Sequence, residues 1–201
     1  MSSAEPIPVI PNQHPRSVDA CRRCDLWGPA TRGVPGEGPA HAPLMLVGEQ
    51  PGSEEDQAGL PFVGPAGRML DRALEAASIS RQEVFVTNAV KHFRFRLRGK
   101  RRIHQKPSIR QVEQCRWWLH KEMEKIEPAV VVAMGATAAR SVLQKPVLIR
   151  EARGQSLDAG GRVVRVTIHP SYLLRLRENR EQEFERFAED LQQAARLARR
   201  G

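Results

Sequence analysis

A glycine- and proline-rich stretch with one acidic residue is the first candidate for chemistry in this sequence. Residues 48–52 read Gly-Glu-Gln-Pro-Gly, and a second stretch of the same kind covers residues 59–67. Glycine lets backbone approach a ligand closely, and proline stiffens the loop. The loop therefore places the carboxylate of Glu49 near a ligand, with an ordinary strand-to-helix loop as the alternative. It matches neither a phosphate-binding loop nor a dinucleotide-binding loop.

Two more polar side chains follow apolar runs. Asn88 ends one run, and its side-chain amide donates and accepts hydrogen bonds at once, which suits reading a base edge. His169 begins the sequence His-Pro-Ser-Tyr-Leu-Leu-Arg, which suits a catalytic loop that also wedges into a duplex. An asparagine that merely ends a strand is the alternative for Asn88, and the His169 segment does not identify a function by itself.

Residues 91–110 hold nine lysines and arginines and no acidic residue. Such a run predicts a loop that contacts phosphates, with a solvated charged loop as the alternative. His104 lies inside this run, within Lys-Arg-Arg-Ile-His-Gln. The neighbouring positive charges disfavour the imidazolium form, so they keep the ring neutral and nucleophilic.

The cysteines indicate a metal site. Cys21 and Cys24 form a C-x-x-C pair, and Cys115 lies on a later predicted helix. Three thiolates and a histidine suit structural zinc, and they also suit an iron–sulfur cluster. The alternative is that Cys115 is simply a buried apolar residue. The histidines that qualify as the fourth ligand are His14, His41, His92 and His120.

Length and charge limit the class of protein. The chain has 201 residues, which suffices for a hydrophobic core, and 32 basic against 23 acidic residues give a net charge of +9. This charge favours a polyanionic partner, nucleic acid before an anionic membrane. We expect a cytoplasmic protein, because no apolar stretch is long enough to span a membrane and the first residues lack a secretory signal.

These groups need elements that position them. Apolar runs predict strands at residues 43–48, 84–90, 129–135 and 163–168, and helical patterns cover residues 66–77, 108–126, 135–143 and 181–198. The alternation predicts an α/β fold of three layers, αβα, with a central four-stranded parallel sheet. Ligands of such sheets bind at the carboxyl ends of the strands, so residues 48–52, 88–92, 135 and 169–171 should share one site. We expect a single domain over residues 1–201, with residues 1–17 as a loose arm.

Together these segments resemble the uracil-DNA glycosylase superfamily in its iron–sulfur branch, from about Cys21 to Leu197. The most specific match is residues 48–52 with residues 59–67, and residues 87–91 and 169–171 follow in the expected order. The resemblance implies a 4Fe-4S cluster, with zinc as the less favoured alternative. Three cysteines match the cluster pattern, and His92 stands where the family usually has another cysteine. The implied ligands are Cys21, Cys24, His92 and Cys115.

Two departures narrow the resemblance. Gln50 replaces the small residue that usually follows the glutamate, and the loop between His92 and Cys115 is longer than the family norm. Both features resemble the UdgX subfamily, whose members bond covalently to uracil-containing DNA. The string Lys-Arg-Arg-Ile-His-Gln over residues 100–105 is that subfamily's signature.

The resemblance implies roles for single residues. Phe62 stacks on uracil, Asn88 bonds its polar edge, and His169 donates to its O2. His104 adds to the sugar C1′, while Glu49 orients the imidazole and takes its proton. Gln50 contacts the base or helps to place Glu49 or the loop. The DNA contacts come from Lys100, Arg101, Arg102, Ser171 and Arg175.

The expected partner is uracil-containing DNA, single- or double-stranded, bound by a monomer. Three alternatives remain. An ordinary glycosylase with multiple turnovers uses every motif except the loop signature. A non-catalytic, metal-stabilised nucleic-acid-binding module needs only the charge, so it leaves Glu49, Asn88 and His169 unexplained. A nucleotide-binding protein would need a phosphate loop, which this sequence lacks.

Overall fold

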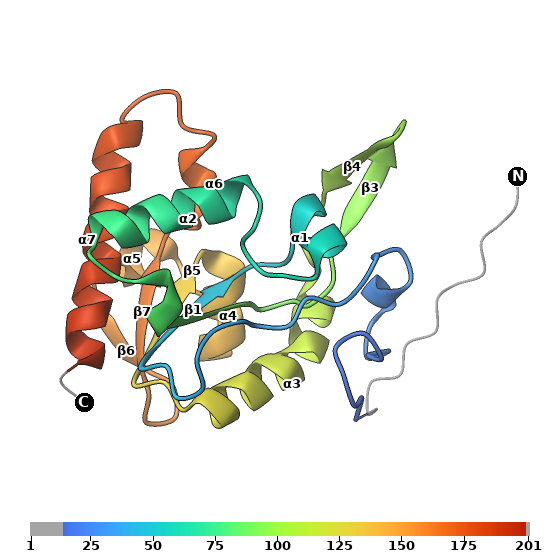
Figure 1. Ribbon diagram of the computed structural model, residues 1–201, viewed down its shortest axis with the longest axis horizontal. Helices are drawn as coiled ribbons and strands as arrows, with labels where there is room; N and C mark the ends of the chain where they lie inside the picture. The colour runs from blue at the N-terminus through green and yellow to red at the C-terminus, as the bar shows by residue number, and fades with distance from the viewer. Residues whose placement is uncertain (1–13, 200–201) are drawn as a thin grey trace, which may run out of the picture.

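The computed structural model describes residues 14–199, and within them a five-stranded sheet forms the centre (Figure 1). Its strand order is β2-β1-β5-β7-β6, and the pairs β2–β1, β1–β5 and β5–β7 are parallel. Each parallel strand lies inside one of the predicted apolar runs, so the parallel core of the sheet is confirmed. The bounds of these strands are Leu44–Gly48 for β1, Val84–Asn88 for β2, Val130–Met134 for β5 and Val163–Thr167 for β7.

The predicted count of four strands is corrected, because the described chain adds an edge strand. This strand, β6 (Ser156–Asp158), pairs antiparallel with β7. It has three residues and both ends are exposed. A strand this short and exposed carries no apolar run, so sequence periodicity does not reveal it.

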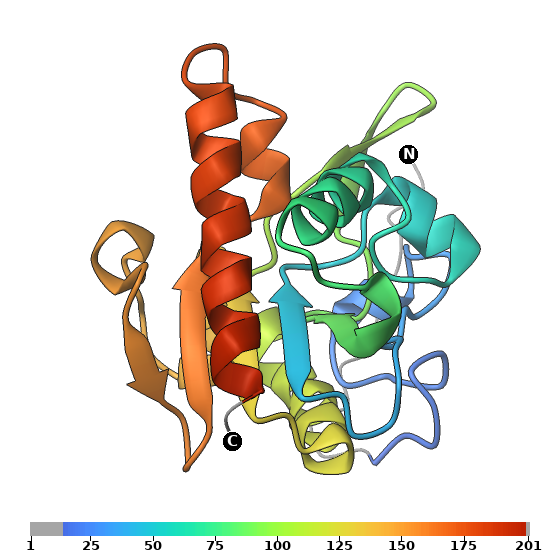
Figure 2. The same ribbon diagram turned by 60° about the vertical axis from the view of Figure 1, so that its left-hand side comes forward.

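Successive side chains of the parallel strands point to opposite faces of the sheet. In β1, Leu44 and Leu46 pack with α2 and α7, whereas Met45 and Val47 pack with α3 and α4. Figures 1 and 2 show these helix pairs on opposite sides of the sheet, which confirms the three layers. The bounds are Pro65–Ala76 for α2, Ile109–Ile126 for α3, Ala136–Leu143 for α4 and Arg180–Ala198 for α7.

Local sequence signals set where these helices begin. Ser108 caps α3: its hydroxyl accepts from the Gln111 main-chain N–H, and the Gln111 side chain accepts from the Ser108 N–H. Pro65 opens α2, where its missing N–H costs no helical hydrogen bond. The shorter helices are η1 (Asp25–Trp27), α1 (Ser53–Ala58), η2 (Arg81–Glu83), α5 (Ile149–Ala152) and α6 (Pro170–Leu173).

The basic run differs from the predicted loop, because part of it is a β-hairpin that projects from the body (Figure 1). Strand β3 (Phe95–Arg98) pairs antiparallel with β4 (Arg101–His104). Gly99 makes the turn at a φ of 59°, a left-handed conformation that suits glycine. Strand β3 alternates apolar and arginine side chains over only four residues, and β4 has a single apolar residue, Ile103, so the sequence pattern does not reveal the hairpin.

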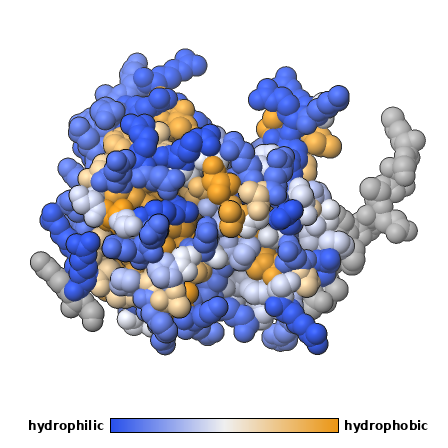
Figure 3. Space-filling view, viewed as in Figure 1, coloured by the Kyte–Doolittle hydropathy of each residue, from blue (hydrophilic) through white to orange (hydrophobic). Residues whose placement is uncertain are grey.

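Most of the face in Figure 3 is hydrophilic, with smaller hydrophobic areas between the charged side chains. Within residues 14–199, every helix is too short or too polar to cross a membrane. Of the expected loose arm, residues 1–13 lie outside the described residues, and residues 14–17 form neither helix nor strand.

Candidate active site

The carboxyl ends of β1, β2, β5 and β7 meet around a cavity of about 980 Å³. The register of the sheet puts Gly48 beside Asn88, so the first and second candidate segments become neighbours. His92, by contrast, lines a different cavity. The candidate site residues that line the larger cavity are Glu49, Gln50, Phe62, Asn88, His104, His169, Ser171 and Arg175.

Glu49 joins two elements that lie far apart in the sequence. Its Oε1 lies 3.3 Å from Nε2 of His104 on the hairpin, and its Oε2 accepts a 2.6 Å hydrogen bond from the Thr137 hydroxyl. Burial by itself raises the pKa of Glu49, but the hydrogen bonds from His104 and Thr137 lower it by more. The net pKa lies below the ordinary value, so the carboxylate is ionised at neutral pH. Sequence reasoning missed Thr137, which α4 places there from its first turn.

His169 is held as a neutral imidazole. Its Nδ1 accepts from the Ser171 main-chain N–H at 3.2 Å and lies 2.8 Å from the Ser171 hydroxyl. Burial lowers the pKa of His169 to about 4, although the charge of Glu49 opposes this shift. Because Nδ1 is an acceptor, the ring proton is on Nε2, which makes Nε2 a hydrogen-bond donor. Arg175 donates in turn to the Ser171 hydroxyl at 3.2 Å.

Close packing between glycines and two site residues fixes the cavity wall. Phe62 has a φ of 57°, and its ring centre lies 6.1 Å from that of His169. A Cβ on Gly67 would come within 1.7 Å of the Phe62 carbonyl oxygen, and one on Gly48 within 2.5 Å of both the Phe62 ring and Asn88 Oδ1. Neither glycine can carry a side chain, which explains why this loop is rich in glycine.

Gln50 fastens the base of the hairpin. Its Nε2 donates to the main-chain oxygens of Arg94 at 3.2 Å and Gln105 at 3.0 Å, and its Oε1 accepts from the Arg94 N–H at 3.0 Å. Arg94 and Gln105 flank the two ends of the hairpin, so one side chain holds both. Because its amide is occupied in this way, Gln50 is better explained as a residue that positions the loop than as one that contacts the base.

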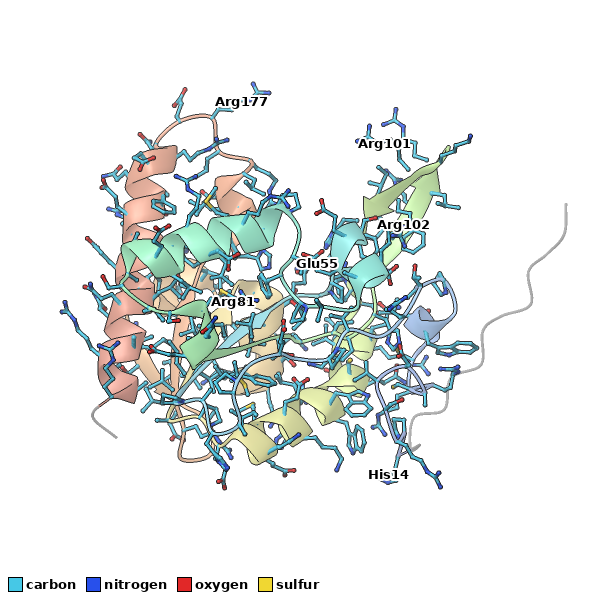
Figure 4. All side chains as sticks on the ribbon, in the orientation of Figure 1. His14, Glu55, Arg81, Arg101, Arg102 and Arg177 are labelled. Carbon is cyan, nitrogen blue, oxygen red and sulfur yellow. The ribbon has the colours of Figure 1, made fainter. Side chains whose placement is uncertain are left out.

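The predicted DNA-contacting arginines differ in their surroundings. Arg101 lies at the outer part of the hairpin and points away from the body, whereas Arg102 lies beside α1 (Figure 4). The side chain of Arg102 is 16% exposed, and it forms an ion pair with the buried Asp56. It also donates to the Thr31 hydroxyl and to Ser53. Arg102 therefore fastens the hairpin to α1, while Lys100 and Arg101 are exposed.

The three cysteines are buried free thiols, and Cys21 and Cys24 lie close enough to Cys115 to affect its pKa. The pKa of Cys24 is raised to about 11, mainly by burial and to a smaller extent by Cys21. Burial also raises the pKa of Cys115, with additional contributions from Cys24 and Cys21. The main-chain N–H of Lys91 donates to Cys115 Sγ at 3.2 Å. The fold thus brings Cys21 and Cys24 near Cys115 on α3, which a shared metal site would require.

His92 follows Lys91 directly and is also buried. Burial lowers its pKa to about 4, although Asp19 and Asp56 oppose this shift, so its ring is neutral and able to bind a metal. It lines a cavity of about 370 Å³ with Asp19 and Arg22 among others. As placed in residues 14–199, no three His, Cys, Asp or Glu side chains are arranged around one metal position. The donor set nevertheless fits a metal group chemically, because a bound metal offsets the cost of ionising buried thiols.

An ionised carboxylate, two imidazoles and an amide at the carboxyl ends of a parallel sheet define an α/β protein with an acid–base site. The sequence matches the model of the uracil DNA glycosylase superfamily over residues 35–192. The chain belongs to this superfamily.

Relatives agree with this assignment. The chain is 38% identical over 180 residues to the Type-4 uracil-DNA glycosylase of Thermotoga maritima, which covers 88% of each chain. It is 32% identical over 185 residues to the Type-4 uracil-DNA glycosylase of Archaeoglobus fulgidus, covering 87% of this chain and 89% of the relative. The Type-5 uracil-DNA glycosylase of Pyrobaculum aerophilum is 30% identical over 174 residues, with 78% and 74% covered.

Proposed function

We propose that this protein is a uracil-DNA glycosylase of the UdgX kind, which excises uracil and captures the sugar C1′ on His104. Superfamily membership and the names of the relatives support the excision. One observation carries the capture: the projecting hairpin brings His104 Nε2 within 3.3 Å of Glu49 Oε1, in the wall of the cavity that would take the base.

Recognition begins with a deoxyuridine flipped out of the DNA into this cavity. Phe62 stacks on the uracil ring, and the Asn88 amide pairs with its polar edge. His169 directs its Nε2–H at uracil O2. The phosphate backbone of the DNA is contacted by exposed or half-buried side chains at the cavity rim and on the hairpin: Lys100, Arg101, Ser171 and Arg175.

Excision breaks the bond between C1′ and uracil N1, and the electron pair of that bond moves onto the base. The hydrogen bond from His169 stabilises the negative charge that develops on O2. The sugar becomes oxocarbenium-like, as in glycoside cleavage generally. The ionised Glu49 carboxylate stabilises this positive charge at close range.

Capture then replaces the attack of water. The Nε2–H bond of His104 breaks as the bond to C1′ forms: its electron pair makes the new C–N bond, and its proton passes to Glu49 and from there to the departing uracil. One C–N bond breaks and another forms, so charge and protons balance. The new bond has no activated leaving group, and its hydrolysis is therefore slow. The protein ends as a stable adduct with DNA.

A 4Fe-4S cluster would be held by Cys21, Cys24, His92 and Cys115, with zinc as the alternative. When bound, the cluster supplies a covalent cross-link between the N-terminal segment, the start of the basic run and α3. It takes no part in the chemistry of excision or capture. His92 lies only a few residues before the hairpin, so the cross-link would steady the element that carries His104.

The test uses a labelled oligonucleotide with one uracil, run on a denaturing gel. We expect a shifted band that survives boiling in SDS with the native protein, and its loss in His104→Ser. A free oligonucleotide that breaks only after alkali would instead show an ordinary multiple-turnover glycosylase, as the names of the relatives suggest. Intact DNA in both assays would leave only a nucleic-acid-binding module.

The proposal extends to the setting of the protein. It takes residues 1–201 as one domain that acts as a monomer in the cytoplasm, on uracil-containing DNA. Both single- and double-stranded substrates are compatible with it.

A further inference from the structure

Lys91 is the largest of the fully buried side chains among the described residues, and it carries a charge. Its Nζ donates to Glu122 Oε2 at 2.6 Å, to the Thr87 hydroxyl at 2.6 Å and to the Asn88 carbonyl oxygen at 2.8 Å. All three donor positions of the ammonium group are therefore used. The excision chemistry has no step for this buried group, so its position needs a different explanation.

Glu122 completes the network from α3. Its Oε1 accepts from the Gly36 main-chain N–H at 2.9 Å, and its Oε2 also accepts from the Thr87 hydroxyl at 2.7 Å. The pair thus ties together the segment before β1, the end of β2 and helix α3. A buried ion pair with this many hydrogen bonds fixes geometry, because each group has one arrangement that satisfies it.

The contact with Asn88 decides what the network fixes. The Asn88 carbonyl belongs to the same peptide group as the Ala89 N–H, which donates to the Gly48 oxygen at 2.9 Å. This peptide group is therefore held at both ends, by β1 on one side and by Lys91 on the other. Thr87, on the other side of Asn88, is held by the same ammonium group. The backbone on both sides of Asn88 is locked, and its side chain takes its direction from that backbone.

We propose that Lys91 is a positioning residue for base recognition, which aims the Asn88 amide at the uracil edge. The inference rests on the proposed function and deepens it. Thr87 and Glu122 act with Lys91, because they fill the remaining positions around the ammonium group. Lys91 touches no part of the substrate.

The test compares Lys91→Met with the native protein in single-turnover uracil excision. We expect the maximal rate to fall about 10- to 100-fold, because a small misplacement of a recognition group costs this much. The DNA concentration at half-saturation should stay within about twofold, since the phosphate contacts are intact. Lys145→Met, at an exposed lysine between α4 and α5, is the matched control and should leave both values unchanged.

A double-mutant cycle separates positioning from a general loss of stability. If Lys91 acts through Asn88, then adding Lys91→Met to Asn88→Ala should not lower the maximal excision rate below that of Asn88→Ala alone. Additive losses, or a change confined to half-saturation, would overturn the inference while leaving the proposed function intact. A native protein that releases no uracil would instead overturn the proposed function and this inference with it.

A second variant covers the case in which Lys91→Met does not fold, since it leaves the Glu122 charge buried without a partner. Lys91→Met combined with Glu122→Gln removes both charges and keeps an acceptor for the Gly36 N–H. We expect the same loss of maximal rate and the same lack of additivity with Asn88→Ala. Excision by this variant at the native rate, with native circular dichroism, would refute a positioning role.

Discussion

At the scale of single residues, the carboxylate of Glu49 contacts two side chains that have different roles. His104 is the proposed nucleophile, whereas Thr137 has no reactive role and donates to the other carboxylate oxygen. That second hydrogen bond keeps the carboxylate ionised and fixes its rotation. The orientation of the nucleophile therefore depends on a side chain 88 residues away from Glu49 in the sequence.

Replacing Thr137 tests this dependence. Thr137→Val removes the hydroxyl at nearly constant volume, and a hydrogen bond to a charged group is worth about 1.5 kcal/mol or more. We expect adduct formation to slow about 10-fold in a gel-based single-turnover assay. Thr137→Ser keeps the hydroxyl and should form the adduct at close to the native rate. Equal rates in the valine and native proteins would contradict this role.

His169 gives the stability a pH dependence of known sign. Its pKa is about 4 in the folded protein against 6.5 ordinarily, so between these values the unfolded chain binds more protons. The free energy of unfolding should therefore fall as the pH is lowered from 6.5 towards 4. Glu49, with its lowered pKa, adds a loss of the same direction only near and below its ordinary value of 4.5.

Urea unfolding of His169→Asn measures this contribution. Between pH 6.5 and 4.5 the variant should lose less stability than the native protein, because its side chain does not titrate. Above pH 7 the two proteins should show parallel pH dependence. His92 is unchanged by the substitution, so its contribution is the same in both proteins. Identical slopes below pH 6.5 would show that His169 is not held neutral.

At the scale of elements, the hairpin β3–β4 needs its anchors. Two paired strands alone are marginally stable in water, so this hairpin depends on contacts with the body. Gln50 holds its base, and Arg102 fastens its second strand to Asp56 in α1. Gln50 and Arg102 thus both hold the hairpin that places His104 beside Glu49.

The two neighbouring arginines should separate in their salt dependence. Arg101→Gln removes a phosphate contact and should reduce the slope of log affinity against log salt by about 1. Arg102→Gln should leave that slope unchanged, because its guanidinium is occupied within the protein. It should instead slow capture on His104, since the hairpin is released. Binding titrations at several salt concentrations check the slopes, and a flattened slope for Arg102→Gln would contradict its assignment to the hairpin.

At the scale of the whole molecule, the net charge of +9 and the cysteines address different needs. The positive charge attracts the phosphates of any DNA, so this attraction does not depend on the base sequence. The buried thiols lie where the N-terminal segment meets α3, and none of them lines the cavity that holds Glu49 and His169. A metal group there would tie a chain segment with few apolar residues to the body.

Metal analysis of protein purified without oxygen tests this assignment. We expect iron and acid-labile sulfide, with a brown colour, and a lower melting temperature in Cys115→Ser. A fall of about 5–10 °C corresponds to ~2.5 kcal/mol in a protein of this size. Ser141→Ala, a buried hydroxyl on α4, is a control outside the thiol group. Zinc alone, with no iron, would reject the iron–sulfur assignment.

The sequence by itself determined the parallel strands, the four long helices and the polar residues Glu49, Asn88 and His169 of the cavity. Glu49, Asn88 and His169 each follow an apolar run, and the carboxyl ends of parallel strands meet at one edge. Such signals are local, because they consist of a few adjacent residues of fixed type. The same holds for the caps that begin α2 and α3.

Only the tertiary structure decided which polar groups meet. Thr137 with Glu49, Arg102 with Asp56, and Lys91 with Glu122 are pairs between residues far apart in the chain. The sequence pattern around a polar side chain does not predict its partner, and lysine and arginine are usually predicted to be exposed. The structure shows the opposite at Lys91 and Arg102, because a charged side chain can be buried or half-buried when an acidic partner and further hydrogen bonds compensate for the loss of water.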